Sequence, residues 1–99
     1  MSETIVIFRK DRTGWREPFA LFPELPADQL GIYCDSYQHV GQHCAADYHG
    51  CIANSRPAMP EEAAPLLAEL KCIGYEPRVL TRASRRHHDA RLTLAREGL

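Results

Sequence analysis

Residues 4–8 constrain the fold most strongly, because they predict a strand that is buried on both faces. The segment reads Thr-Ile-Val-Ile-Phe, so apolar side chains occupy successive positions of the alternation. β-branched and aromatic residues favour strands, and apolar residues on both faces are typical of a strand in the middle of a sheet. The chain has 99 residues, which is enough for one domain with one core.

Four further strands are expected from short segments bounded by proline or glycine. They cover residues 19–22, 31–40, 48–55 and 75–81. Pro23 is expected to end the second strand, because proline lacks the N–H that a strand ladder requires. Residues 41–47 are expected to form a loop or a single helical turn. Pro77 places the last strand at an edge or a bulge.

Two helices are expected in the second half of the chain. The first begins at Pro60, which suits the first helical position, and ends before Gly74. Its spacing predicts an apolar face made of Ala63, Leu66, Leu67, Leu70 and Ile73. The second covers residues 83–97, opens at Ser84 and has few apolar residues.

These elements predict an α+β fold: a small, mostly antiparallel sheet of four to five strands, one packed helix and a second C-terminal helix. Residues 1–82 are expected to form a single α+β domain, and residues 83–99 a basic C-terminal helix or tail. Periodicity places seven apolar residues in the core. They are Ile5, Ile7, Phe19, Leu21, Leu66, Leu67 and Leu70.

Residues 34–51 gather three of the four cysteines and three of the five histidines. Imidazole and thiolate both suit zinc, so His39 and His43 with Cys44 and Cys51 are the candidate ligands of a structural zinc ion. The spacing matches no established zinc motif. The alternative is a hairpin in which the cysteines are small core residues. A weaker alternative is a small hydrolase or thiol enzyme, with Cys44 or Asp47 beside a histidine.

Charge is distributed unevenly along the chain. Residues 1–77 hold 11 acidic and 6 basic residues, whereas residues 78–99 hold 2 acidic residues and 6 arginines. An acidic protein or a nucleic acid is therefore the candidate partner. The candidate contacts are Arg82, Arg85, Arg86 and Arg91, together with Trp15 in a basic loop. A solvated helix docked on the acidic body is the alternative.

The sequence favours the cytoplasm and no membrane partner. No apolar run approaches the roughly 20 residues that span a bilayer. The N-terminus lacks the basic start and the cleavage site of a signal peptide. In the cytoplasm the cysteines are expected to be reduced and unpaired.

Several segments together resemble a family of short uncharacterised bacterial proteins associated with phages, plasmids and integrated mobile elements. They are residues 20–28 (Ala-Leu-Phe-Pro-Glu-Leu-Pro-Ala-Asp), 37–43 (Tyr-Gln-His-Val-Gly-Gln-His), 46–48 (Ala-Asp-Tyr), 55–58 (Ser-Arg-Pro-Ala) and 74–75 (Gly-Tyr). The resemblance implies an accessory protein and transfers no catalytic residue. The leading expectation is thus a small binding or interaction module with a protein or nucleic-acid partner, rather than an enzyme.

Overall fold

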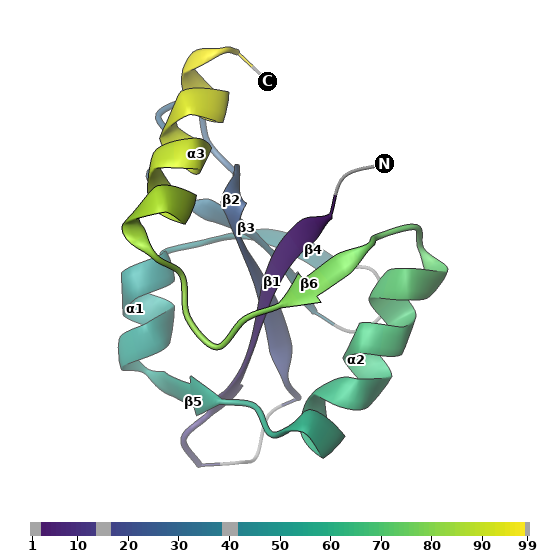
Figure 1. Ribbon diagram of the computed structural model, residues 1–99. Coiled ribbons are helices and arrows are strands. Elements are labelled where there is room, and N and C mark those ends of the chain that lie inside the picture. The colour runs from purple at the N-terminus through teal and green to yellow at the C-terminus, as the bar shows by residue number, and fades with distance from the viewer. Residues whose placement is uncertain (1–2, 14–16, 39–41, 99) are drawn as a thin grey trace.

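The computed structural model describes residues 3–13, 17–38 and 42–98, and these form one sheet with helices on both sides (Figure 1). The elements in chain order are β1 (Thr4–Asp11), β2 (Phe19–Pro26), β3 (Cys34–Gln38), β4 (Gln42–Ala46), α1 (Tyr48–Ala53), β5 (Ser55–Pro57), α2 (Pro60–Cys72), β6 (Pro77–Val79) and α3 (Arg85–Arg96). The predicted α+β class is confirmed. The described part of the sheet has six strands, one more than the upper prediction.

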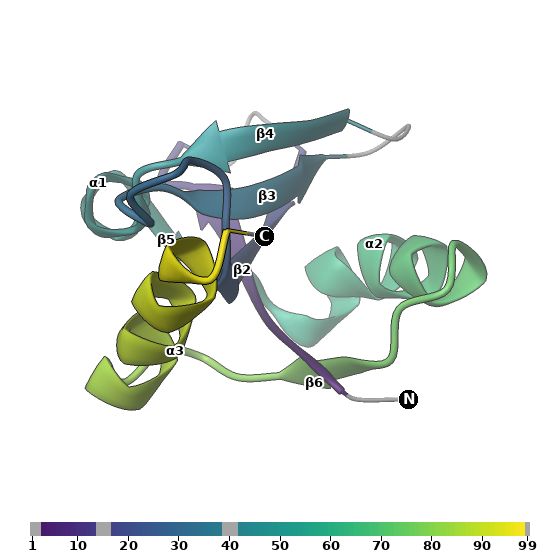
Figure 2. The same cartoon turned by 90° about the horizontal axis from the view of Figure 1, so that it is seen from above.

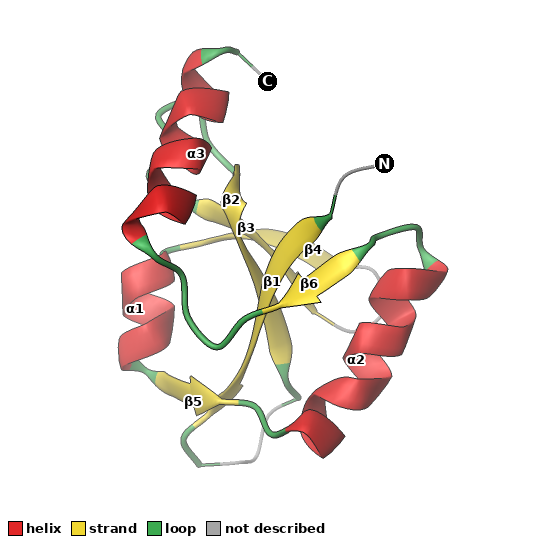
Figure 3. Cartoon of the chain, in the orientation of Figure 1, coloured by secondary structure: helices red, strands yellow, loops and turns green. Residues whose placement is uncertain are grey.

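Strand β1 is an interior strand, next to the end of the order β4-β3-β2-β1-β5 (Figure 3). Strand β2 pairs with one of its edges, and β3 and β4 continue the sheet on that side. The other edge of β1 is shared: its first half pairs parallel with β6, and its second half pairs antiparallel with β5. All other pairings are antiparallel, so the sheet is mostly antiparallel, as predicted. Strand β4 is an outermost strand, at the end farthest from β5.

The side chains of β1 alternate between two apolar clusters, which explains the continuous apolar run at its start. On one face, Val6 and Phe8 pack under α2 with Leu66 and Leu70. On the other face, Ile7 belongs to a cluster that includes Tyr48 of α1. Figure 2 shows α2 on one side of the sheet and α1 and α3 on the other.

The seven predicted core residues are mostly buried, as expected. Ile5, Ile7, Leu21, Leu66 and Leu70 are buried. Phe19 and Leu67 are partly buried, and each packs against one of the two clusters.

The predicted end of β2 at Pro23 is wrong, because the strand continues to Pro26. Its pairing with β3 shifts register between Phe22 and Pro26. An irregular stretch of this kind does not require an N–H from every residue, and proline is tolerated there.

Two adjacent predictions, for residues 41–47 and 48–55, are also wrong. The loop expected at 41–47 contains β4, which forms a hairpin with β3 over five residue pairs. The strand expected at 48–55 is instead α1 followed by β5. Tyr48 and Ile52 both pack on the cluster around Ile7. Residues four apart share a helix face as readily as alternate residues share a strand face, so a short run does not distinguish the two.

Helices α2 and α3 begin close to their predicted starts. Pro60 is the first residue of α2, and the Glu62 carboxylate accepts the N–H of Met59 at 2.8 Å. Gly74 follows α2 with a φ of 111°, a conformation that favours glycine. Ser84 precedes α3, and its N–H donates to Nδ1 of His87 at 2.9 Å.

Candidate functional site

A cleft of about 810 Å³ opens on the face of the sheet that carries α1. We call it the α1 cleft. It lies within the size range of small-molecule sites. Its carboxylates are Asp11, Glu17 and Asp47; its thiols are Cys44 and Cys51; its neutral polar residues are Ser36, Gln38, Asn54 and Ser55; and the rest of its lining is Pro18, Phe19, Ala45, Ala46 and Gly50.

Strand alternation decides which members of segment 34–51 reach this cleft. Ser36 of β3 pairs with Cys44 of β4, and both line the cleft. The next pair along, Tyr37 and His43, faces the opposite side of the sheet, because successive strand residues point to opposite faces. The segment is therefore divided between two faces and does not converge on one point.

His43 belongs to an aromatic cluster on the α2 side of the sheet. Its Nε2 lies 3.1 Å from the hydroxyl of Tyr75, and its ring meets the Tyr37 ring edge-on at a centroid distance of 4.8 Å. Phe22 stacks on Tyr75 at 5.2 Å, and the Tyr37 hydroxyl donates to Glu69 of α2. These contacts give His43 a packing role between β4 and the chain that follows α2.

A buried arginine, Arg9, is hydrogen-bonded to Ser55, one of the residues that line the cleft. Arg9 donates through Nε to Oγ of Ser55 at 2.9 Å, and through Nη2 to the carbonyls of Ser55 and Ile52 at 2.8 and 3.1 Å. These bonds join β1 to β5 and to the end of α1. Burial lowers the pKa of Arg9. The guanidinium donates to backbone and hydroxyl oxygens rather than to the carboxylates of the cleft, and its positive charge opposes the rise in the pKa of Cys51.

The charged side chains that line the α1 cleft are acidic. Three carboxylates line it, and no lysine or arginine of the described residues does. Within the described residues, the side chains of Glu17 and Asp47 form no hydrogen bond or ion pair. Because unpaired carboxylates lower the energy of a nearby cation, the cleft favours positively charged groups.

The Cys51 thiol of the cleft does not resemble an activated nucleophile. All four cysteines of the chain are free, as predicted. Burial, and then the neighbouring Asp47 carboxylate, raise the pKa of the Cys51 thiol. A catalytic thiol requires the opposite shift, produced by nearby positive charge. Cys44 is exposed at the edge of the cleft. The weaker prediction of a thiol enzyme therefore gains no support from Cys51.

The predicted zinc ligands are only partly described. His39 lies outside the described residues. Cys44 and Cys51 line the α1 cleft, whereas His43 faces α2. Among the described residues, no three His, Cys, Asp or Glu side chains are grouped so that they could hold a metal ion. Zinc binding through His39 stays a prediction.

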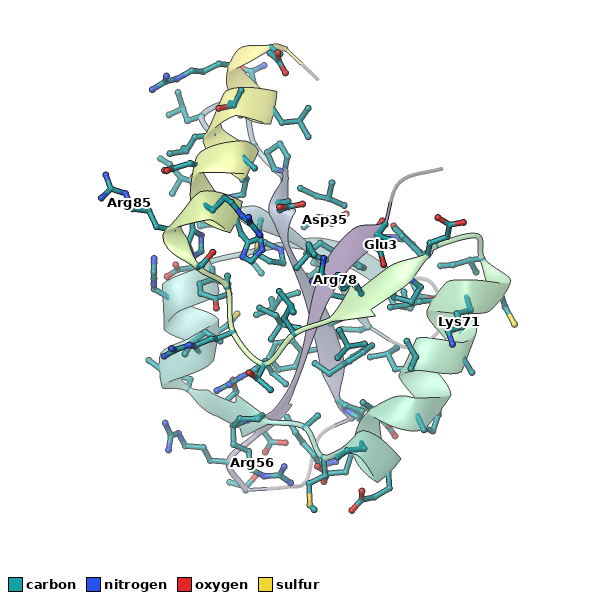
Figure 4. The ribbon with its side chains drawn as sticks, in the orientation of Figure 1. Glu3, Asp35, Arg56, Lys71, Arg78 and Arg85 are labelled. Carbon is teal, nitrogen blue, oxygen red and sulfur yellow. The ribbon has the colours of Figure 1, made fainter. Side chains whose placement is uncertain are left out.

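The predicted partner-binding arginines separate into two sets. Arg82, Arg85 and Arg86 are exposed, and Arg85 points away from the body of the molecule (Figure 4). Arg91 is buried at 5% exposure and donates to the carbonyls of Gly31 and Pro23 at 2.9 and 2.7 Å. It therefore anchors α3 to β2 and does not belong to the exposed basic surface. Trp15 lies outside the described residues.

Sequence reasoning missed two of the three carboxylates in the cleft. Asp11 ends β1 and Glu17 precedes β2, whereas Asp47 follows β4. The three residues line one cleft only because β1, β2 and β4 belong to one sheet, with Asp11 and Glu17 toward one end of it and Asp47 toward the other. No local sequence motif identifies these carboxylates, so their common position in the cleft could be recognised only once the order of the strands was known.

Comparison of the chain with protein families, curated proteins and solved structures found no significant match. None of the helices in the described ranges combines the length and apolar character needed to cross a membrane.

Proposed function

We propose that the protein is a small binding module that holds a cationic group of its partner in the α1 cleft. The observation that carries the proposal is that two carboxylates lining this concave site, Glu17 and Asp47, have no side-chain partner among the described residues. The register of β2, β3 and β4 places them toward opposite ends of the cleft, so each is a separate contact for a cation. Phe19 and Ala46 supply apolar surface beside them. A charged group on an apolar stem, such as a lysine or arginine side chain or an organic amine, matches this lining.

Binding of N-acetylarginine amide, measured by chemical-shift titration, is the direct test. We expect saturable shifts at the amides of Cys44, Asp47 and Gly50, with affinity falling as salt is added. N-acetylcitrulline amide has nearly the same shape without the charge, and it should bind at least about fivefold more weakly, in the range of an exposed ion pair. Equal affinity for the two compounds would contradict a site selected by charge.

Substitutions in the cleft should weaken this binding without unfolding the protein. Glu17→Gln and Asp47→Asn each remove one charge and keep the side-chain shape. Each change should weaken binding of the arginine amide by about two- to fivefold. Glu61→Gln is the matched control, because Glu61 is an exposed carboxylate on α2, outside the cleft. An equal loss in all three variants would indicate a nonspecific charge effect.

A second candidate function is contact with nucleic acid through the start of α3. Arg82, Arg85 and Arg86 are exposed, and Arg85 forms an ion pair with Asp89 at 3.9 Å. Replacing all three by glutamine should weaken binding to a mixed-sequence duplex and reduce the slope of log K against log salt by about three. Arg96→Gln, at the far end of α3, is the control. Binding that survives the triple change would assign the contact elsewhere.

We retain the cytoplasm as the proposed compartment, and an accessory role alongside mobile elements as the proposed setting. The four free thiols support the compartment, because thiols persist in a reducing environment.

A further inference from the structure

We propose that the partner presents its cationic side chain on an extended segment that pairs with the outer edge of β4. This inference rests on the proposed function of the α1 cleft and adds the form of the ligand. It follows from two features that lie next to each other. One is the outer edge of β4, with which no described residue pairs, and the other is the α1 cleft with its carboxylates.

The outer edge of β4 is available for pairing. Strand β4 is the edge strand at one end of the sheet, and no described residue pairs with its outer side. Its pairing with β3 is regular over all five residues, so its backbone is held straight. An edge of this kind presents a row of N–H and C=O groups that an added strand can satisfy.

Strand β4 also lacks the features that usually protect an edge. Natural edge strands are blocked by lysine, proline or a bulge. The strand reads Gln-His-Cys-Ala-Ala, which contains no charged residue and no proline, and His43, Cys44 and Ala45 are exposed. The hydroxyl of Ser36 donates to the carbonyl of Cys44 at 2.7 Å, which further fixes the strand.

The charge of the cleft selects the occupant of this edge. On an added strand, every second side chain would lie on the cleft side of the sheet, beside Cys44. Asp47 directly follows β4 and lines the same cleft. A lysine or arginine at such a position would lie near the Asp47 carboxylate, whereas an acidic residue would be repelled by it.

A second copy of the chain fits the edge less well. If β4 paired with β4 of another copy, the added strand would bring no lysine or arginine. It would instead bring a second Asp47 next to the first cleft and leave the negative charge uncompensated. Charge complementarity therefore favours a basic extended segment of a different protein.

The test uses three acetylated and amidated pentapeptides. The first is Thr-Val-Arg-Val-Thr, the second has Glu in place of Arg, and the third has both Val residues replaced by Pro. We expect the first peptide to shift the amide resonances of β4 and Asp47. The glutamate peptide should bind at least about tenfold more weakly because its charge is reversed, and the proline peptide about three- to tenfold more weakly because ladder hydrogen bonds are lost.

A pair of variants tests the edge itself. His43→Lys adds a protective charge to β4 on the face away from the cleft, and Ala64→Lys adds a positive charge to an exposed position of α2. The first should weaken binding of the arginine peptide by at least about threefold, and the second should leave it unchanged. Equal effects of the two variants would overturn strand pairing.

The outcomes separate this inference from the function on which it rests. If the proline peptide and N-acetylarginine amide bind as well as the arginine peptide, strand pairing is wrong and the cation site stands. If neither the arginine peptide nor the amide binds, both proposals fail. Concentration-dependent dimerisation by sedimentation, with shifts confined to β4, would assign the edge to a second copy and overturn the inference.

Discussion

Replacing Leu70 with alanine is expected to lower the free energy of unfolding by about 2–5 kcal/mol. Leu70 is fully buried in α2, and it packs in the cluster with Val6, Phe8 and Phe22 from the sheet. The substitution removes apolar contact and leaves a cavity that the surrounding strands fill only in part. Urea denaturation followed by circular dichroism gives the value.

Leu30→Ala is the matched control, because Leu30 is 71% exposed in the loop between β2 and β3. The same chemical change should there alter stability by no more than about 0.5 kcal/mol. A Leu70→Ala effect as small as that of the control would contradict the packing of α2 against the sheet.

Arg91→Ala is expected to destabilise the protein by about 2–4 kcal/mol, although arginine is usually a surface residue. Its guanidinium satisfies the carbonyls of Pro23 and Gly31, and both of these residues are buried. Without it, two buried acceptors lose their donor, and α3 loses a bond to β2. Thermal unfolding and hydrogen exchange of α3 measure the loss.

Arg85→Ala is the control for Arg91, because the Arg85 side chain is 94% exposed in the same helix. We expect a change within about 0.5 kcal/mol. If the two variants had equal stabilities, the buried arginine would not anchor the helix. Arg91→Lys separates charge from geometry, because a single ammonium does not reproduce the planar arrangement of guanidinium donors.

The parts of the fold that sequence predicted well are those with long or distinctive periodicity. The apolar run in β1 and the spacing of Leu66 and Leu70 in α2 require particular faces to be buried, and they are. Apart from the predicted end of β2 at Pro23, the failures occur in residues 41–55, where short segments fit strand, loop and helix equally. There tertiary pairing decides: β3 converts an expected loop into β4, and the cluster around Ile7 holds Tyr48 as a helix residue.

The candidate site was predictable only in part for a related reason. Cys44, Asp47 and Cys51 belong to residues 34–51, the segment rich in cysteine and histidine, and all three line one cleft. His43 lies in the same segment, but its side chain is on the opposite face of the sheet, against Tyr37. Asp11 at the end of β1 and Glu17 before β2 are distant in sequence from Asp47, and composition does not predict that all three line one cleft.

The rate of alkylation of Cys44 relative to Cys72 tests the α1 cleft most directly. Both thiols are exposed, but only Cys44 lines the cleft, and Cys72 ends α2. Iodoacetamide labelling with and without N-acetylarginine amide, followed by peptide mass spectrometry, gives both rates in one sample. At a ligand concentration ten times the dissociation constant, Cys44 should react about tenfold more slowly, in proportion to the free fraction, while Cys72 keeps its rate. Unchanged labelling of Cys44 at a concentration that saturates binding, or equal slowing of both thiols, would contradict a cation site in this cleft.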